Sequence, residues 1–174
     1  MVNYRLTSMD GYADKMGELV WMLQHARQVT LNEIDSLTKQ ALDFLSDSQA
    51  NSIGALLSHI AAIEYVHQVI SFEKRDLSTD ELSKWSAALQ LGTQAREAIQ
   101  GHSISYYLEQ LANVRSDTLS YLKSKDDDWL YEEHQWDNGV TYNQYYLWFH
   151  VLEDEINHRG QIRAIKRTLK QLNM

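Results

Sequence analysis

Apolar residues recur at steps of three and four in four long segments of the chain, which is the spacing that places side chains on one face of an α-helix. These segments are residues 8–29, 52–74, 103–124 and 141–171. A helix with an apolar stripe has to bury that stripe against another element to keep it out of water. The pattern therefore predicts an all-α fold in which four long helices pack as a four-helix bundle.

Two of the four stripes are interrupted by polar residues. The first stripe consists of Met9, Tyr12, Met16, Leu19, Leu23 and Ala26, and the third consists of Ile104, Leu108, Leu111 and Leu122. The second stripe consists of Leu56, His59, Ile63, Val66 and Ile70, and the fourth consists of Leu147, Val151, Asp154, His158, Ile162, Ile165 and Leu169. His59, Asp154 and His158 thus occupy positions where the helical period calls for apolar side chains.

The links between the helices predict where each helix begins and how the helices follow one another. Asn51 or Ser52 can cap the second helix, and Ser103 can cap the third. The link over residues 75–102 is much longer than the other two, and Ser78 and Glu81 within it have the spacing of a capping box. That spacing predicts a short helix that ends near Gly92. A crossover of this length lets the second and third helices run parallel, because a short loop forces neighbouring helices to be antiparallel.

Composition narrows both the fold class and the chemistry. The chain of 174 residues contains no cysteine, no proline and seven glycines. Sandwiches and barrels with many strands need turns rich in glycine and proline, so this composition favours a few long helices. The absence of cysteine excludes disulfides, thiolate metal ligands and a cysteine nucleophile. The length predicts a single domain over residues 1–174.

Charge and hydropathy indicate which partners and compartments to expect. The net charge of −8 argues against a partner with a phosphate backbone. The N-terminal residues lack the basic start and apolar run of a signal peptide. The longest apolar stretch, 53–70, contains His59, Glu64 and His67, so no window reads as a membrane span. We therefore expect a cytoplasmic protein that binds neither nucleic acid nor a membrane.

The polar residues in the apolar stripes are candidate metal ligands. Asp154 and His158 lie one helical turn apart, so their side chains share one face with Cβ atoms about 5–6 Å apart. A buried carboxylate without a cationic partner costs roughly several kcal/mol. A divalent metal ion held by His59, Asp154 and His158 would meet that need. Two histidines and one carboxylate also leave coordination positions open, as catalytic sites do.

Other interpretations of these residues remain open. Asp154 and His158 could form a stabilising polar pair, and a single histidine in an apolar stripe is more often a hydrogen-bonded core residue than a ligand. His150, one turn before Asp154, could be a fourth ligand or could orient another ligand. His67 is expected at the rim of the site. The remaining histidines, His25, His102 and His134, are expected on the surface or in loops.

Three weaker features accompany these candidates. Acidic and aromatic side chains are interleaved over residues 126–136, which could line the mouth of a pocket but more often form a solvated loop whose aromatic rings pack against the bundle. The basic residues of 159–170 favour the dipole at the end of the fourth helix. Arg115 and Thr118 lie near the third stripe and could face the proposed cavity.

Two segments resemble a known superfamily. The segment from Trp148 to Ile162 reads WFHVLEDEINHRGQI, and the segment from Asn51 to Glu64 reads NSIGALLSHIAAIE. Both resemble the DinB/YfiT-like superfamily of bacterial metalloenzymes, and the ending HRGQI is the most specific feature. The resemblance covers nearly the whole chain. It implies a four-helix bundle with up-down-down-up topology, a long crossover between helices two and three, and a homodimer.

The resemblance also implies a metal site and a reaction class. It makes His59 and His158 ligands of a divalent nickel, zinc or iron ion. The third ligand is usually histidine in DinB-type members and is Asp154 here, whereas the related thiol-dependent maleylpyruvate isomerase group has a carboxylate at that position. The chemistries implied are transfer with an external low-molecular-weight thiol such as bacillithiol, or metal-assisted hydrolysis. The DNA-damage link of the family concerns induction and implies no contact with DNA.

Two functions from different classes follow from these observations. The first is a metal-dependent transferase or hydrolase that acts on a small-molecule substrate. The alternative is a non-catalytic dimeric helical bundle, a sensor or structural protein, in which Asp154 and His158 form a buried polar pair.

Overall fold

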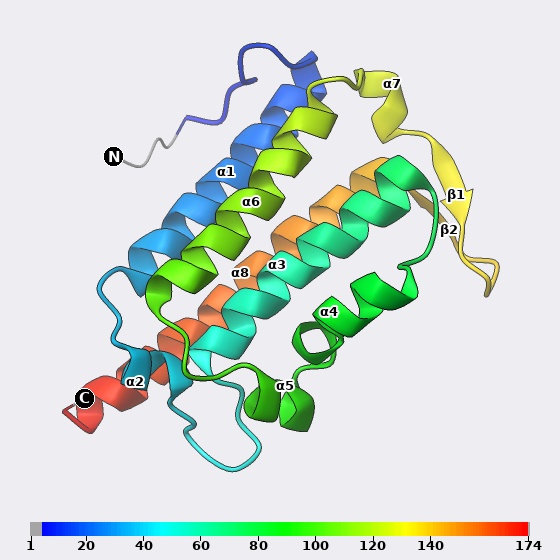
Figure 1. The fold of residues 1–174 in the computed structure, drawn as a ribbon. Coiled ribbons are helices and arrows are strands. Elements are labelled where there is room, and N and C mark those ends of the chain that lie inside the picture. Colours follow the sequence, from blue (N-terminus) through cyan, green and yellow to red (C-terminus); the bar gives the residue numbers. More distant parts are fainter. Residues whose placement is uncertain (1–4, 174) are drawn as a thin grey trace.

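Four long helices dominate the structure, a computed structural model that describes residues 5–173. The first four residues and residue 174 of the expected domain lie outside this range, as does the start of the segment considered as a signal peptide. The long helices are α1 (Asp14–Ile34), α3 (Ile53–Gln68), α6 (Ile104–Leu122) and α8 (Gln144–Gln171), and they lie side by side in Figure 1. The predicted all-α class fits this largely helical chain, with one two-stranded hairpin as an addition.

Shorter elements fill the links between these helices. The crossover contains α4 (Thr79–Gln90) and α5 (Gly92–Ala98), and a π-helical segment, η1 (Val69–Glu73), extends α3. The remaining short elements are α2 (Lys39–Asp43), α7 (Asp127–Leu130), β1 (Glu133–Gln135) and β2 (Thr141–Asn143). In Figure 1, α4 runs alongside α3, and the hairpin of β1 and β2 projects beyond the end of α3. The crossover therefore covers α3 instead of extending into solvent.

Side-chain caps explain where α3 and α4 begin. The Ser52 hydroxyl accepts a hydrogen bond from the Ala55 amide at the start of α3, which settles the choice between Asn51 and Ser52. Ser78 and Glu81 form the predicted capping box of α4. Ser103 is the residue before α6, but its side chain makes no capping bond. The capping box fixes the start of α4, and α4 supplies one contact of the candidate site.

The first and fourth helices begin later than the periodicity predicts. A turn precedes α1, in which Gly11 has φ +84°, a backbone conformation that α-helices exclude. This turn brings Met9 against Gly17, where an added Cβ would lie 2.6 Å from the Met9 amide nitrogen. The expected helical residues 141–143 form β2, which pairs with β1, and α8 begins only after that strand. Both corrections come from contacts that helical periodicity does not report.

Helix α3 forms the centre of the core. By length and hydropathy, the span Ile53–Glu73 could cross a membrane, but 78% of its apolar window is buried inside the protein. The packing against α6, α8 and α4 accounts for this apolar surface. Two predicted stripe residues, Met9 and Leu108, are exposed at 36% and 38%. Glu64, which was not in a predicted stripe, is fully buried.

Contacts between the long helices report their relative directions. Along α3 and α6, Ser58 bonds Gln110 and Gln68 bonds Thr118, so the residue numbers rise together. Along α3 and α8 the numbers run in opposite directions, because His59 lies against His158 and His67 lies against His150. The second and third long helices are therefore parallel to each other, and α8 is antiparallel to α3.

Candidate metal centre

The three sequence candidates meet where α3 crosses α8. His59 comes from α3, and Asp154 and His158 come from α8, one turn apart. One ligand atom from each lies within 4.8 Å of the other two. The Asp154 Oδ1 atom is 3.2 Å from His158 Nε2 and 3.6 Å from His59 Nε2. The fold thus brings together two imidazole nitrogens and one carboxylate oxygen, a group that could hold a metal ion.

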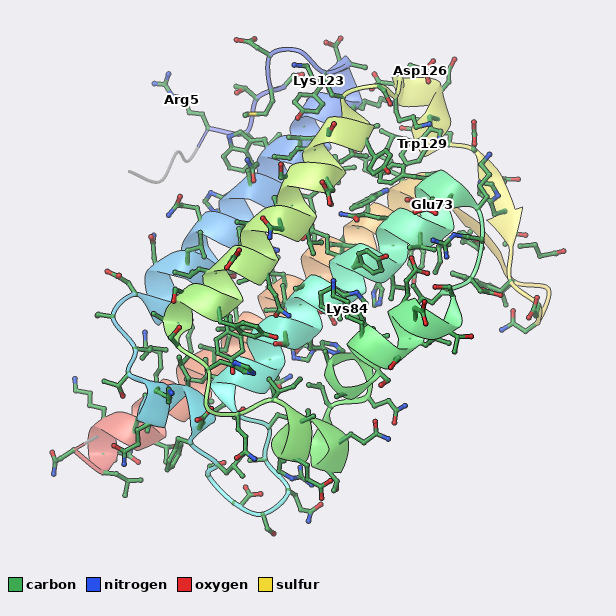
Figure 2. The ribbon with its side chains drawn as sticks, viewed as in Figure 1. Arg5, Glu73, Lys84, Lys123, Asp126 and Trp129 are labelled. Atoms are coloured by element: carbon green, nitrogen blue, oxygen red, sulfur yellow. The ribbon has the colours of Figure 1, made fainter. Side chains whose placement is uncertain are left out.

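The crossover helix α4 fixes the orientation of His59. The His59 Nδ1 atom lies 2.8 Å from the Ala88 carbonyl oxygen. A carbonyl only accepts hydrogen bonds, so Nδ1 carries the proton and Nε2 keeps its lone pair on the side of Asp154 and His158. This is the usual arrangement of a metal-binding histidine, whose second nitrogen donates to a carbonyl or carboxylate. In Figure 2, Lys84 marks α4 beside α3.

Electrostatics favour the charged form of the Asp154 carboxyl. Burial alone would raise its pKa, but the neighbouring imidazoles of His158 and His59 outweigh burial and hold the pKa well below its usual range. Burial alone would lower the pKa of His59, and the contacts with Asp154 and the Ala88 carbonyl raise it instead. The candidate centre therefore contains a largely buried, negatively charged carboxylate, which attracts positive charge.

Two atoms of the group lack partners, which tests whether a metal would fit. Asp154 Oδ2 and His158 Nδ1 are buried and make no hydrogen bond within the described part of the chain. A buried carboxylate oxygen without a donor is costly, and a cation would offset that cost. Two nitrogens and an oxygen suit zinc, nickel or iron. The residues present thus fit a divalent ion.

His67 and His150 lie outside this group of ligand atoms. His67 is 7% exposed, so the expectation that it lies at the rim is wrong. Its ring centroid is 5.5 Å from that of His150, and neither ring belongs to the group of three ligand atoms. These two histidines form a second pair further along α3 and α8.

A buried cluster of four charged residues, one from each long helix, lies beside the candidate centre and was not predicted. Arg27 of α1 contacts Glu64 at 2.8 Å and Glu155 at 3.0 Å. Arg115 of α6 contacts Glu64 at 2.6 Å and Glu155 at 3.3 Å. All four are at most 5% exposed. We call this set the four-charge cluster.

The four-charge cluster corrects the expectation for Arg115 and Thr118. Both bind Glu64 in the interior instead of facing a substrate cavity. Burial alone would raise the pKa of Glu64, but Arg115 and Arg27 outweigh burial and lower it to about 2. The sequence contains two signals of the four-charge cluster. Glu155 is next to Asp154, and Glu64 lies inside an apolar helix. Each of these could have been read as an exposed acid.

Fold, site and sequence motifs agree on the class of this protein: it is DinB/YfiT-like. The family model described as mycothiol-S-transferase matches residues 18–171. The match covers most of the chain, and the protein belongs to that family. The predicted superfamily is therefore confirmed. No curated protein matches the chain.

Solved structures share the fold at low sequence identity. A conserved protein from Enterococcus faecalis has a TM-score of 0.67 at 16% identity, covering 86% of this chain and 93% of its own. A protein from Streptococcus pneumoniae has a TM-score of 0.67 at 14% identity, covering 96% and 94%. An uncharacterised Escherichia coli protein has a TM-score of 0.63 at 14% identity, covering 91% and 95%. At these identities the likeness concerns the fold alone.

Proposed function

We propose that this protein is a metal-dependent S-transferase that joins a low-molecular-weight thiol to a small electrophilic substrate. The observation that carries the proposal is the convergence of His59, Asp154 and His158, with the His59 lone pair directed at the other two. The family match supplies the reaction class. The chain has no cysteine, so the thiol has to come from a cosubstrate.

In this proposal each residue of the group has a separate task. His59 and His158 contribute neutral imidazole nitrogens, and Asp154 contributes the negative charge that selects a divalent cation. A bound nickel, zinc or iron ion would stabilise the thiol as thiolate. Ala88 keeps His59 in the tautomer that can bind, and the buried position keeps most water from the group.

Metal analysis of the protein purified without a histidine tag tests the ligand set. We expect about one divalent ion per chain, and near-complete loss of the ion in His59→Ala and His158→Ala, because two ligands hold an ion far more weakly than three. His102→Ala is the matched control, since His102 stacks on Tyr106 away from the group. Full metal content in both ligand variants would show that the assignment is wrong.

Conjugation tests the reaction class. Mycothiol or bacillithiol and 1-chloro-2,4-dinitrobenzene, incubated with the metal-loaded protein, should give the thioether and chloride. Loss of the reaction in His158→Ala together with loss of metal would tie the activity to the site. A metal-loaded protein that forms no thioether with either thiol would contradict the transferase assignment and leave metal-assisted hydrolysis as the reaction to test.

One observation favours a second, non-catalytic function. Asp154 Oδ1 already lies within 3.6 Å of both imidazoles, so a protonated histidine could neutralise it without a metal. The protein would then be a helical sensor or structural protein. Absence of metal after purification and after incubation with zinc, nickel or iron salts would favour this function over the transferase.

The proposal includes an architecture and a setting. We propose an up-down-down-up four-helix bundle, which the parallel contacts of α3 and α6 support. We propose a cytoplasmic homodimer that binds neither nucleic acid nor a membrane, in keeping with the net charge and the buried α3. Light scattering of the purified protein measures the dimer directly, and a monomeric mass would contradict it.

A further inference from the structure

The outward side of α8 carries exposed residues at alternating steps of three and four. This is the heptad spacing of a coiled coil, in which such positions form the seam between two helices. The exposed heptad positions, which we call the α8 seam, are Tyr146, Phe149, Glu153, Ile156, Gly160, Arg163, Arg167 and Lys170. In Figure 1, α8 lies behind α3, and its C-terminal end reaches past the start of α3. The α8 seam extends over about 36 Å, which is long enough for a second helix to pack along it.

The first half of the α8 seam is largely apolar. Tyr146, Phe149 and Ile156 are 50%, 48% and 46% exposed. One exposed apolar side chain is ordinary, but a row of large apolar side chains on one helix face is typical of an interaction site. Packing this row against a partner would remove its apolar area from water and stabilise the complex.

The second half of the α8 seam is basic. Arg163, Arg167 and Lys170 are exposed there. The acidic residue of the seam, Glu153, belongs to the apolar half, and its side chain is 57% exposed although it lies 3.4 Å from His150. The two halves of the seam therefore complement each other, and two copies of α8 bring them together when they run antiparallel.

One antiparallel register matches the central layers of the seam in charge and in size. In this register Glu153 faces the partner's Arg163, and Ile156 faces the partner's Gly160, where the small residue has room for a side chain. An added Cβ on Gly160 meets nothing within 4 Å in its own chain. Arg163 uses its Nε–H on Glu33 of its own chain, at 2.8 Å, and the guanidinium has further N–H groups for a second carboxylate.

The same register places a cation against each aromatic ring of the seam. Phe149 faces the partner's Arg167, and Tyr146 faces the partner's Lys170. A cation over an aromatic face is attracted by the ring quadrupole. Because the interface has twofold symmetry, each of these contacts forms twice.

Other ways of pairing two copies of α8 fit less well. Parallel helices would place Arg163, Arg167 and Lys170 each against its own copy, and like charges repel across an interface. A shift of one heptad in one direction places Glu153 against the partner's Ile156. A shift in the other direction places Ile156 against the partner's Arg167. Each shift loses the ion pair and sets a charge against an apolar side chain.

We propose that a second copy of this chain binds along the α8 seam, with the two α8 helices antiparallel and the twofold axis level with His158. The interface belongs to the proposed homodimer and does not depend on the proposed reaction. Ile156 and Gly160 are each two residues from His158, and two residues turn a helix by about 200°. The α8 seam therefore lies on the opposite side of α8 from the candidate metal centre, so both centres of the dimer stay uncovered.

Sedimentation of the full chain over a range of concentrations tests the interface. We expect a dimer for wild type, and a dissociation constant raised roughly 30-fold or more in Gly160→Arg, which sets a long cation against the partner's Ile156. Circular dichroism should show an intact fold, because a Cβ on Gly160 meets nothing in its own chain. Ala112→Arg, at an exposed position of α6, is the matched control and should dimerise as wild type does.

Two outcomes of this experiment would overturn the proposal. The first is an unchanged dissociation constant in Gly160→Arg, which would place the dimer interface elsewhere. The second is a wild-type protein that stays monomeric. Binding of that monomer to phosphatidylglycerol vesicles would assign the α8 seam to a membrane surface instead of a second copy.

Crosslinking tests the register independently of any loss of stability. The chain has no cysteine, so a disulfide can form only between introduced residues. Glu153→Cys and Arg163→Cys are mixed under reducing conditions and then oxidised, and the mixture should give a covalent dimer. Each variant alone should give little, because its two cysteines are about 15 Å apart along the helices, beyond the reach of a disulfide.

The crosslinking result is independent of the proposed reaction. A covalent dimer from Glu153→Cys alone, or none from the mixture, would overturn the register. A crosslinked protein that binds metal and forms no thioether would overturn the transferase and leave the interface in place.

Discussion

At the scale of single residues, the partners of a charge in the interior decide its role. Glu64 and Asp154 are both acids on helix faces that turn inward, yet they have different environments. Glu64 is fully buried and accepts hydrogen bonds from Arg27, Arg115 and Thr118, so its charge is balanced by the protein itself. Asp154 Oδ2 has no hydrogen-bond partner among residues 5–173. The first arrangement supports the fold, and the second can bind a cation.

Glu64→Leu should be strongly destabilising. The substitution leaves Arg27 and Arg115 buried with only Glu155 to balance them, and breaking a buried ion pair in this way costs about 3–5 kcal/mol. Denaturant unfolding measures the loss. Glu109→Leu, at an exposed position of α6, is the control and should change stability by less than about 0.5 kcal/mol. A loss below about 1 kcal/mol for Glu64→Leu would mean that the cluster contributes little.

At the scale of elements, a tyrosine ring of α6 that lies on a glycine of α3 sets how the two helices pack. A Cβ added at Gly54 would lie 2.4 Å from the hydroxyl oxygen of Tyr107, which is itself fully buried. The absence of a side chain at Gly54 therefore leaves room for the Tyr107 ring against α3. Because His59 follows about one turn later on α3, this approach also sets the position of the first ligand.

Gly54→Ala should destabilise the protein by about 1–3 kcal/mol, because the added methyl group forces Tyr107 or the helices to move. Gly160→Ala is the matched control, since a Cβ on Gly160 of α8 would meet nothing within 4 Å. That substitution should stabilise the protein by roughly 0.5–1 kcal/mol through helix propensity. Thermal unfolding of both variants measures the difference, and equal effects would contradict the close approach.

At the scale of the whole molecule, the four-charge cluster joins all four long helices through side chains far apart in the sequence. Arg27 and Glu155 are 128 positions apart, and Arg27 and Glu64 are 37 positions apart. A change of charge at Glu64 therefore alters the charge balance of a cluster to which every long helix contributes. Protonation of Glu64 at low pH should therefore destabilise the whole bundle and not one helix alone.

The stability of the protein should fall as the pH drops below about 4.5. The folded-state pKa of Glu64 is about 2, below its ordinary value of 4.5, so the stabilisation is complete above 4.5 and is lost as pH falls towards 2. Denaturant midpoints measured across this range test the dependence. Glu64→Gln, which cannot titrate there, should show a flatter dependence, and an equally steep one would assign the effect to other carboxyls.

Features that depend on neighbours along the chain could be predicted before the fold was known. Helical period gave the four long helices, local caps gave the starts of α3 and α4, and the polar interruptions at His59, Asp154 and His158 gave the candidate ligands. Even the likeness to the DinB/YfiT-like superfamily depends on two continuous segments. Each of these signals lies within a few helical turns, where one residue constrains the next.

The way in which distant residues share the interior became visible only in the folded chain. It placed Arg27, Glu64, Arg115 and Glu155 in one cluster, set the Ala88 carbonyl against His59, and buried His67 beside His150. Periodicity could not distinguish an acid that faces solvent from one that faces two arginines, because both satisfy the same helical spacing. That choice depends on which helix packs against which, and therefore on the fold as a whole.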